Sequence, residues 1–489
     1  VELVNFFPQP GYVELRRGHA VHSDTLTGLP VETVMGFQGN IATQDRLFAA
    51  SDDAIYDVTS SPSVITTVIG TLNNRWQSTM FASGGGNVLW ICNGEDVPRY
   101  YNGTAWVTTV ITGAGFVPED IIHVSSYRNR LWGVIRDSTI AVYGGVDSVT
   151  GAFVTFDVGG QFPNGGYLQA IGTWSTDTQN GPNEFIVFVS NYGDCAVYLI
   201  PDVTTAAGIN YLGTSSLGST IGRRCLCKVG SDLALITIEG VVPLSQVINY
   251  DRAAIQNKAL TANIRTAMTA AAQRQKDYFG WQLISYPRNT MAILNVPVAE
   301  NDIQDQFVMN TITGAWCRFT GQNANCWEVF QDRAYFGGND GVVRLADEGS
   351  GDEDQTLEGD IKCAFNYYET RGQLKRWTMI RPLLTINTAF PTQPYIGINI
   401  DYEDGAVLDP IQFNFGTPTA LWDDPTTAIW DESLWPGEVN SANWASLNGL
   451  GYCASIRMTV TVEWSLSLRT ELALKLNSFD VLFDRGGFI

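Results

Sequence analysis

The stretch RLFAASDDAIYDV (residues 46–58) carries the pattern that decides the fold. An apolar run is followed by two aspartates and then by a second apolar run, which is the pattern of two strands joined by a tight turn. Six similar stretches follow, beginning at Val88, Arg130, Phe185, Leu233, Met291 and Arg333. Equivalent positions in the seven stretches (47, 89, 131, 186, 233, 292 and 334) are 42, 42, 55, 47, 59 and 42 residues apart. These spacings are close to the roughly 40–50 residues of a propeller blade. The sequence therefore predicts a mostly β protein containing a multi-bladed β-propeller of about seven blades.

A second repeated element places a glycine turn directly before an aromatic residue. It reads NGTAW (102–106), TGAF (150–153) and TGAW (313–316). Each copy is typical of a hairpin turn that begins an outer blade strand, with the aromatic ring packed between blades. A set of unrelated hairpins in a β-sandwich is the alternative interpretation.

One segment departs from the β pattern. Residues 259–275 (ALTANIRTAMTAAAQRQ) place Leu260, Ile264 and Met268 at helical spacing. We expect an amphipathic helix inserted in the propeller, which uses these three residues against the propeller or against a neighbouring subunit.

The repeats end at an acidic, glycine-containing stretch, DEGSGDEDQTLEGD (347–360). We predict a propeller in residues 1–350 and a second β domain, resembling a sandwich, in residues 351–489. This second domain contains a loop rich in tryptophan and acid, with Trp422, Trp430, Trp435 and Trp444. The loop either covers a core or serves as a contact surface, and its tryptophans are candidate interface residues.

Composition limits the possible functions. The net charge is −21, which argues against a protein that grips nucleic acid phosphates. Charged residues are only 16% of the chain, compared with about 25% in an ordinary globular protein, and this is typical of surfaces covered in an assembly. We expect a soluble protein, because no apolar run is long enough to span a membrane and no signal peptide is apparent.

No motif for catalysis, metal binding or cofactor binding is recognisable. The eight cysteines have no disulfide or zinc spacing, and the three histidines all lie in the first 123 residues. The acidic stretch 347–360 lacks the ligand spacing of an EF-hand, so a solvated linker is the preferred interpretation, with a bound metal ion as the alternative. The glycine-rich turn SGGGN (83–87) precedes a strand, whereas a phosphate loop precedes a helix. We expect no enzymatic activity and no cofactor.

Several stretches resemble the tail hub or nozzle proteins of short-tailed bacteriophages, which are also called packaged-DNA stabilisation proteins. The resemblance is carried by NFFPQPGYVELRRGH (5–19), GGQFPNGGYLQAIGTWSTD (159–177), GSTIGRRCLCKVGSDLALITIEGVVPLSQ (218–246), QFVMNTITGAWCRFTG (306–321) and GQLKRWTMIRP (372–382). The last hundred residues contribute little to it, and none of these stretches is an active-site signature.

The resemblance implies a non-enzymatic virion protein that is assembled in the host cytoplasm. Such proteins form a ring, usually of six copies, below the portal and the tail adaptor protein. The ring extends the DNA channel, helps to retain the packaged genome until ejection without binding DNA specifically, and anchors fibre, spike or needle proteins. Stable membrane insertion is not expected. Two other functions remain open at this point: a receptor-binding tail module that uses residues 421–445, and a propeller glycosidase that acts on host polysaccharide.

Overall fold

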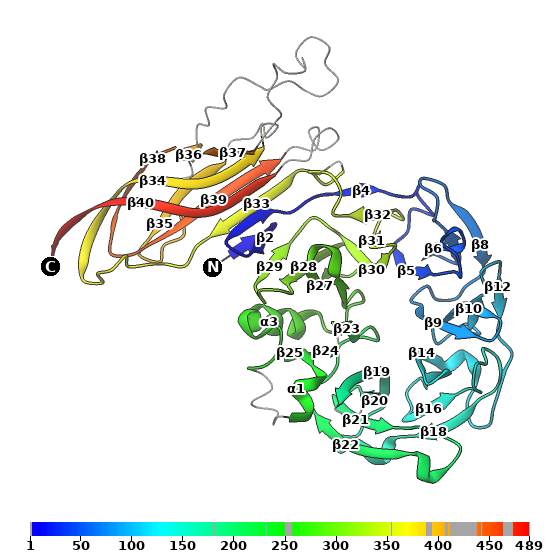
Figure 1. Ribbon diagram of the computed structural model, residues 1–489. Helices are drawn as coiled ribbons and strands as arrows, with labels where there is room; N and C mark the ends of the chain where they lie inside the picture. Colours follow the sequence, from blue (N-terminus) through cyan, green and yellow to red (C-terminus); the bar gives the residue numbers. More distant parts are fainter. Residues whose placement is uncertain are drawn as a thin grey trace. The chain divides into compact units, whose positions relative to one another are not determined.

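The computed structural model divides the chain into two compact units (Figure 1). The propeller unit comprises residues 21–306 and 323–345, and the sandwich unit comprises residues 1–20, 307–322 and 346–489. The residues that the structure describes are 2–178, 181–230, 232–249, 257–353, 355–387, 394–405, 409–410, 438–441, 443–462 and 473–488.

The propeller unit contains seven antiparallel blades in chain order, which we number 1 to 7; six are separate small sheets, and the strands of blade 6 form one end of a nine-stranded sheet. Blade 1 consists of β5 (Val31–Phe37), β6 (Arg46–Ser51), β7 (Ala54–Asp57) and β8 (Ile65–Ile69). Blade 2 consists of β9 (Gln77–Ser83), β10 (Gly86–Cys92), β11 (Arg99–Tyr101) and β12 (Trp106–Thr108). Blade 3 consists of β14 (Ile121–Tyr127), β15 (Arg130–Ile135), β16 (Ile140–Tyr143) and β18 (Val154–Asp157). Blade 4 consists of β19 (Leu168–Thr178), β20 (Gly181–Ser190), β21 (Asp194–Leu199) and β22 (Asn210–Ser216). Blade 5 contains β23 (Leu226–Val229), β24 (Asp232–Thr237) and β25 (Gly240–Pro243). Blade 6 contains β26 (Gln282–Tyr286), β27 (Met291–Ala299) and β28 (Ile303–Asn310). Blade 7 contains β30 (Ala324–Phe330), β31 (Arg333–Gly338) and β32 (Val343–Ala346).

The blades follow one another around a ring, so the predicted propeller is confirmed (Figure 1). All seven repeat positions lie in the second strand of a blade, from Leu47 in β6 to Ala334 in β31. These strands are buried on both faces; β6, for example, has five fully buried residues after Arg46. A strand that contacts a blade on each side must be apolar throughout, which explains why the repeat was visible in the sequence.

Residues from the start of the propeller close the ring. The backbone N–H groups of His22 and Ser23 donate to the carbonyl of Val343, at 2.9 and 3.1 Å, and that of Leu26 donates to Gly341, at 2.9 Å. Blade 7 is therefore completed by residues more than 300 positions earlier in the chain. This closure protects the edge strand that an open array of blades would expose.

Hydrophobic clusters lie between successive blades and hold the ring together. One cluster joins Phe48 of blade 1 to Leu89 and Tyr101 of blade 2, and another joins Trp132 of blade 3 to Phe188 of blade 4. The rings of Trp132 and Phe188 meet edge to face with centroids 5.9 Å apart. Full burial of one such side chain stabilises the fold by about 1.5–3 kcal/mol, so inter-blade packing is a main source of stability.

The glycine turns also behave as predicted in the two copies that lie within blades 2 and 3. Trp106 begins the outer strand β12, and its ring lies 4.9 Å from that of Phe48 in blade 1. Phe153 is buried in the cluster between blades 2 and 3, just before the outer strand β18.

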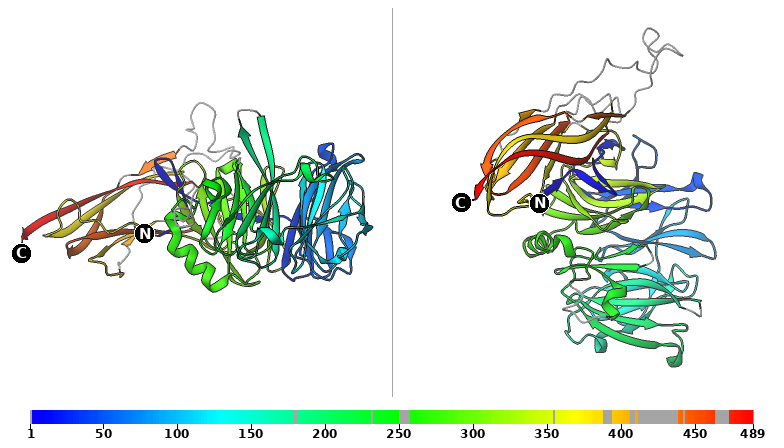
Figure 2. Two further views of the ribbon diagram at one scale, coloured as in Figure 1. Left: turned by 90° about the horizontal axis from the view of Figure 1, so that it is seen from below. Right: turned by 60° about the vertical axis from the view of Figure 1, so that its left-hand side comes forward.

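The helical insertion is shorter than predicted. The helix α3 (Arg265–Gln275), seen as a green helix in Figure 2, is preceded by the 3₁₀ turn η5 (Ala262–Ile264). It contacts β25 and β27. Met268 is fully buried in this packing, as expected for a helix that lies against the propeller, and Leu260 and Ile264 are half-buried; whether these residues also meet a neighbouring subunit stays a prediction. The described helices and smaller elements of the propeller also include β13 (Ile111–Thr112) paired with β17 (Gly151–Ala152), α1 (Leu244–Asn249), η1 (Ala42–Gln44), η2 (Pro118–Asp120), η3 (Gly159–Gln161), η4 (Ala206–Gly208) and η6 (Pro287–Asn289).

The sandwich unit has two sheets that face one another across a single core. One contains β29 (Trp316–Phe319), β1 (Glu2–Val4), β33 (Leu357–Lys362), β39 (Ala454–Val462), β35 (Tyr395–Ile400) and β36 (Asp409–Pro410). The other contains β2 (Phe6–Gln9), β3 (Tyr12–Leu15), β40 (Leu474–Phe488), β34 (Gln373–Asn387), β37 (Glu438–Ser441) and β38 (Ala445–Gly451). Alternate residues of each sheet, such as Ile456 and Met458 of the first and Leu384 and Leu476 of the second, form the core. The predicted sandwich is therefore present.

The N-terminal residues belong to the sandwich unit, whereas the sequence placed them in the propeller. Strand β1 pairs with β33 through Leu3 and Ile361, and Phe6 is buried in the sandwich core. The short strand β4 (His19–Val21) leads from these residues to the propeller. Strands of three or four residues carry no information about a partner 350 positions away, so sequence reasoning could not detect this pairing.

The acidic stretch 347–360 is not simply a solvated linker, because Asp352 within it is only 1% exposed. Over the residues described above, no three His, Cys, Asp or Glu side chains are arranged to hold a metal ion. None of the helices in that part of the chain is long and apolar enough to cross a membrane.

Candidate functional site

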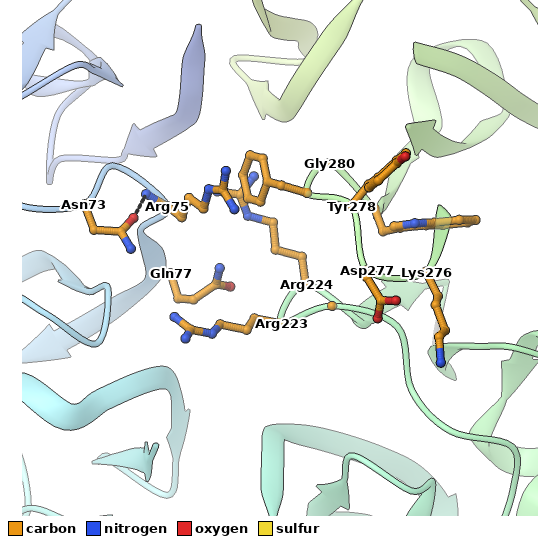
Figure 3. A pocket seen from close by; sticks show the side chains of 12 residues that line it. Asn73, Arg75, Gln77, Arg223, Arg224, Lys276, Asp277, Tyr278 and Gly280 are labelled. Atoms are coloured by element: carbon orange, nitrogen blue, oxygen red, sulfur yellow. Dashed lines mark hydrogen bonds between the residues drawn. The ribbon is translucent and has the colours of Figure 1, made fainter. Parts of the chain in front are cut away.

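A cationic pocket of about 290 Å³ lies within the propeller unit (Figure 3). Three segments line it: the turn before β9 in blade 2, the turn before β23 in blade 5 and the loop before β26 in blade 6. The lining residues are Asn73, Arg75, Gln77, Gly222, Arg223, Arg224, Lys276, Asp277, Tyr278, Phe279, Gly280 and Trp281. Four of these side chains are basic and one is acidic, in a chain whose net charge is −21.

A glycine turn presents the two adjacent arginines. Gly222 has a φ of +68°, a conformation that glycine adopts without strain, and Arg223 and Arg224 follow it directly. The turn belongs to the TIGRRC segment (220–225), which comes before the first strand of blade 5.

Arg224 bridges the axis of the propeller. Its Nη2 donates to the carbonyl of Glu32 at 3.0 Å, to Oγ1 of Thr33 at 2.7 Å and to the carbonyl of Trp76 at 3.2 Å. Thr33 is in blade 1 and Trp76 immediately precedes blade 2, and in a ring of seven blades both are three blades away from blade 5. Only a side chain that crosses the centre of the ring can make these contacts. The propeller axis is therefore closed at this level.

The ring of Phe279 makes cation–π contacts with two of the guanidinium groups. The guanidinium carbon of Arg75 is 4.2 Å from the centre of the Phe279 ring, and that of Arg224 is 5.1 Å away. Cation–π attraction at such distances contributes about 0.5–2 kcal/mol for each pair. The ring thus helps to hold two positive charges close together.

The two pairs of arginine and carboxylate near the pocket involve Arg75. Its Nε lies 2.9 Å from Glu32 Oε1, and its Nη2 lies 2.8 Å from Glu300 Oε1. Arg223 and Arg224 have no ion pair with any described residue; Arg223 Nη1 donates to the carbonyl of Asn93 at 3.0 Å.

Glu328, in β30, does not neutralise Arg224. Burial raises the pKa of the Glu328 carboxyl to about 8, although Arg224 acts in the opposite direction. At neutral pH this carboxyl is therefore mostly protonated. The charge of Arg224 is balanced by carbonyl dipoles, by the Phe279 ring and by the carboxylate of Glu32, which does not form an ion pair with it.

Two polar groups at the pocket have no partner in the described structure. The Nη1 atom of Arg224 is buried and makes no hydrogen bond. Gln77 is only 9% exposed, its side chain makes no hydrogen bond with a described residue, and Figure 3 shows its amide between Arg75 and Arg223. Buried polar groups are nearly always satisfied, so Arg224 Nη1 marks a place where a further molecule can bind.

The groups best suited to nucleophilic or acid–base chemistry are poorly placed for it. Burial raises the pKa of the Cys225 thiol to about 12 and lowers the pKa of His123 to about 4. The positive charge of Arg223 contributes to this lowered pKa of His123, after burial. Neither group is poised to exchange a proton near neutral pH.

A second polar cluster is buried in the sandwich unit. Arg16 donates to both carboxylate oxygens of Asp352, at 2.8 and 2.5 Å, and His19 Nδ1 lies 3.0 Å from Asp352 Oδ1. The remaining N–H groups of Arg16 donate to Asn5 Oδ1 and to the carbonyls of Arg17 and Thr320. All five donors of the guanidinium are therefore used within the fold, which leaves none for a ligand.

The tryptophans predicted as interface residues are only partly described. Trp422, Trp430 and Trp435 lie outside the described residues. Trp444 is 39% exposed, and the guanidinium carbon of Arg381 lies 4.9 Å from the centre of its ring. Trp444 belongs to the sandwich unit, whereas Leu260 and Ile264 belong to the propeller unit.

Sequence reasoning missed the cationic pocket, because its three segments are separated by roughly 50 to 150 residues. The only signal was the doublet Arg223-Arg224, within a segment that we quoted for its resemblance and did not interpret chemically.

Comparison with known proteins gives little further information. No family model and no curated protein matches the chain. Among solved structures, it is similar to crystal structures of BBS1N in complex with ARL6DN, soaked with mercury or with lead. These have TM-scores of 0.43 and 0.42 and 10% identity, and the match covers 69% of this chain and 99% of theirs. A likeness this weak supports no inference, and the propeller assignment rests on the sheet topology described above.

Proposed function

We propose that the protein is a non-enzymatic subunit of a ring in the tail of a short-tailed bacteriophage. In this role, about six copies surround the DNA path below the portal and adaptor, help to retain the genome and anchor fibre, spike or needle proteins. The mature protein would be located in the virion.

The observation that carries the proposal is the position of the residues that resemble the phage family. Arg16, in the segment 5–19, is 4% exposed and fully hydrogen-bonded. Lys375, in the segment 372–382, is fully buried and donates to the carbonyls of Thr370, Gln373 and Tyr452 at 2.5, 3.1 and 3.2 Å. In both segments a buried charged side chain is thus fixed by several hydrogen bonds inside the fold. Such contacts are expected when a resemblance in sequence reflects a shared architecture.

The closed axis of the propeller refines this role. Because Arg224 crosses the centre of the ring of blades, DNA does not pass through the propeller itself. The channel in our proposal is instead the opening between several subunits. An acidic chain suits the wall of such a channel, because a negative surface does not hold phosphates.

Electron microscopy of the purified protein, alone and with its adaptor, tests the assembly. Rings with a central opening wide enough for duplex DNA support the proposal. A protein that stays monomeric with the adaptor at high concentration contradicts it. Genome retention is tested separately, by measuring nuclease-protected DNA in particles that lack the protein. Full retention of DNA in such particles would exclude the retention role.

A further inference from the structure

The cationic pocket has more positive charge than the fold uses. Arg75 is paired with two glutamates, but Arg223 and Arg224 have no carboxylate partner among the described residues. Burial lowers the pKa of both guanidinium groups, and a neighbouring cation, Arg136 for Arg223 and Arg75 for Arg224, acts in the same direction. Both arginines brace the ring, because Arg224 Nη2 and Arg223 Nη1 donate to backbone carbonyls of blades on the far side of the axis, but each has further N–H donors that make no hydrogen bond with a described residue.

The unused donors converge on the pocket from both sides. Arg224 Nη1 is buried without a partner among the described residues, and Arg223 donates one hydrogen bond within the described structure, from Nη1 to the carbonyl of Asn93. The amide of Gln77, which lines the pocket, offers two further N–H donors (Figure 3). Planar guanidinium groups match the spacing of phosphate and carboxylate oxygens, so this donor set is suited to an oxyanion.

We propose that the pocket binds a small molecule with more than one anionic oxygen group, through Arg223, Arg224 and Gln77. The volume of about 290 Å³ is near the lower end of the roughly 300–1,000 Å³ of small-molecule sites and exceeds what a single ion fills. The shared chemistry is that of phosphate- and carboxylate-bearing ligands. Phe279 forms an apolar wall that keeps the guanidinium groups of Arg75 and Arg224 in place.

Calorimetric titration of the full chain with pyrophosphate, at constant ionic strength, tests the proposal. We expect saturable binding and a rise in Tm that sodium chloride at equal ionic strength does not produce. Parallel titration with citrate distinguishes the source of the oxyanion: stronger binding of pyrophosphate indicates a phosphate ligand, and stronger binding of citrate a carboxylate ligand.

Two variants connect binding to the pocket. Arg223→Met and Gln77→Leu remove donors without removing the Arg224 brace, and each is expected to weaken binding at least about tenfold. Arg46→Met is the matched control, because Arg46 pairs with Asp57 outside the pocket and its loss should leave affinity unchanged. Circular dichroism confirms that each variant is folded. The proposal is overturned if neither anion binds saturably, or if both pocket variants bind as tightly as the control. Because the pocket lies within one propeller, this result does not depend on ring assembly.

Discussion

Replacing Asp352 with asparagine should destabilise the sandwich unit far more than a surface substitution of the same kind. The Arg16 and Asp352 side chains are only 1% and 2% exposed, so the guanidinium would lose its counter-charge without access to water. Breaking a buried ion pair from one side costs about 3–5 kcal/mol. Asp352→Asn should therefore lower the free energy of unfolding of this unit by about that amount.

Asp480→Asn is the matched control in the same unit. Asp480 pairs with Arg381, but these side chains are 39% and 35% exposed, and an exposed pair contributes about 0–1 kcal/mol. Urea unfolding followed by hydrogen exchange of peptides from β1–β3 and β33 would measure both effects in the sandwich unit itself. Equal losses in the two variants, or a loss below 1 kcal/mol for Asp352→Asn, would refute the assignment of Asp352 as the buried counter-charge.

The pH dependence provides a second measurement on the same residue. Burial opposes ionisation of Asp352, but Arg16 and His19 outweigh it and hold the pKa of this carboxyl well below its usual value of 3.8. The unfolded state therefore binds a proton before the folded state does, and the stabilisation is present above about pH 4 and lost as the pH falls below it. Asp352→Asn should lack this acid-sensitive component, and an unchanged acid transition in the variant would contradict the argument.

Three further predictions concern other buried groups. The raised pKa of Glu328, about 8, means that the folded propeller keeps a proton that the unfolded chain loses above about pH 4.5, so stability should fall by about 3–4 kcal/mol as the pH rises from 5 to 8. Glu328→Gln should flatten this slope in urea unfolding, and a slope as steep as in the wild type would count against it. Gly18→Ala should lower Tm by several degrees, because the new methyl group would collide with the carbonyl of Gly351, whereas Gly372→Ala meets no atom and should be neutral; similar Tm values for both would disprove the close approach. Lys375→Met should cost about 2–3 kcal/mol by leaving three buried carbonyls with one donor fewer, and a loss under 1 kcal/mol in the same unfolding assay would show that water replaces the ammonium group.

The propeller was predictable because its second strands are buried on both faces. β6 and β31 read as almost unbroken apolar runs, and such runs recur at blade spacing. The outer strand β8 has one buried residue in five and gives almost no signal. The sequence therefore reveals the number of blades more readily than the strands within each blade.

The sites were harder to predict than the fold, because each combines residues that are distant in sequence. Asp352 lies in a stretch whose acidity suggested solvation, and only its partner Arg16, 336 residues earlier, makes its burial possible. Similarly, Arg224 has its role because ring closure brings Thr33 opposite to it. Local pattern identifies residues that are buried by their own segment, but it does not identify charged residues whose partners come from elsewhere.

The closure of blade 7 by residues 22–26 also affects how the propeller is made. During synthesis, the residues around His22 leave the ribosome more than 300 residues before Val343, which they must finally meet. Until then blades 1 and 7 lack a shared boundary, and the cluster that includes Val31 of blade 1 and Tyr335 of blade 7 cannot form. Formation of blade 7 therefore closes the ring and completes its boundary with blade 1 in the same step. A nascent or truncated chain that ends before blade 7 would expose this apolar surface and be prone to aggregation. Such a chain would depend on chaperones, whereas the closed ring would not.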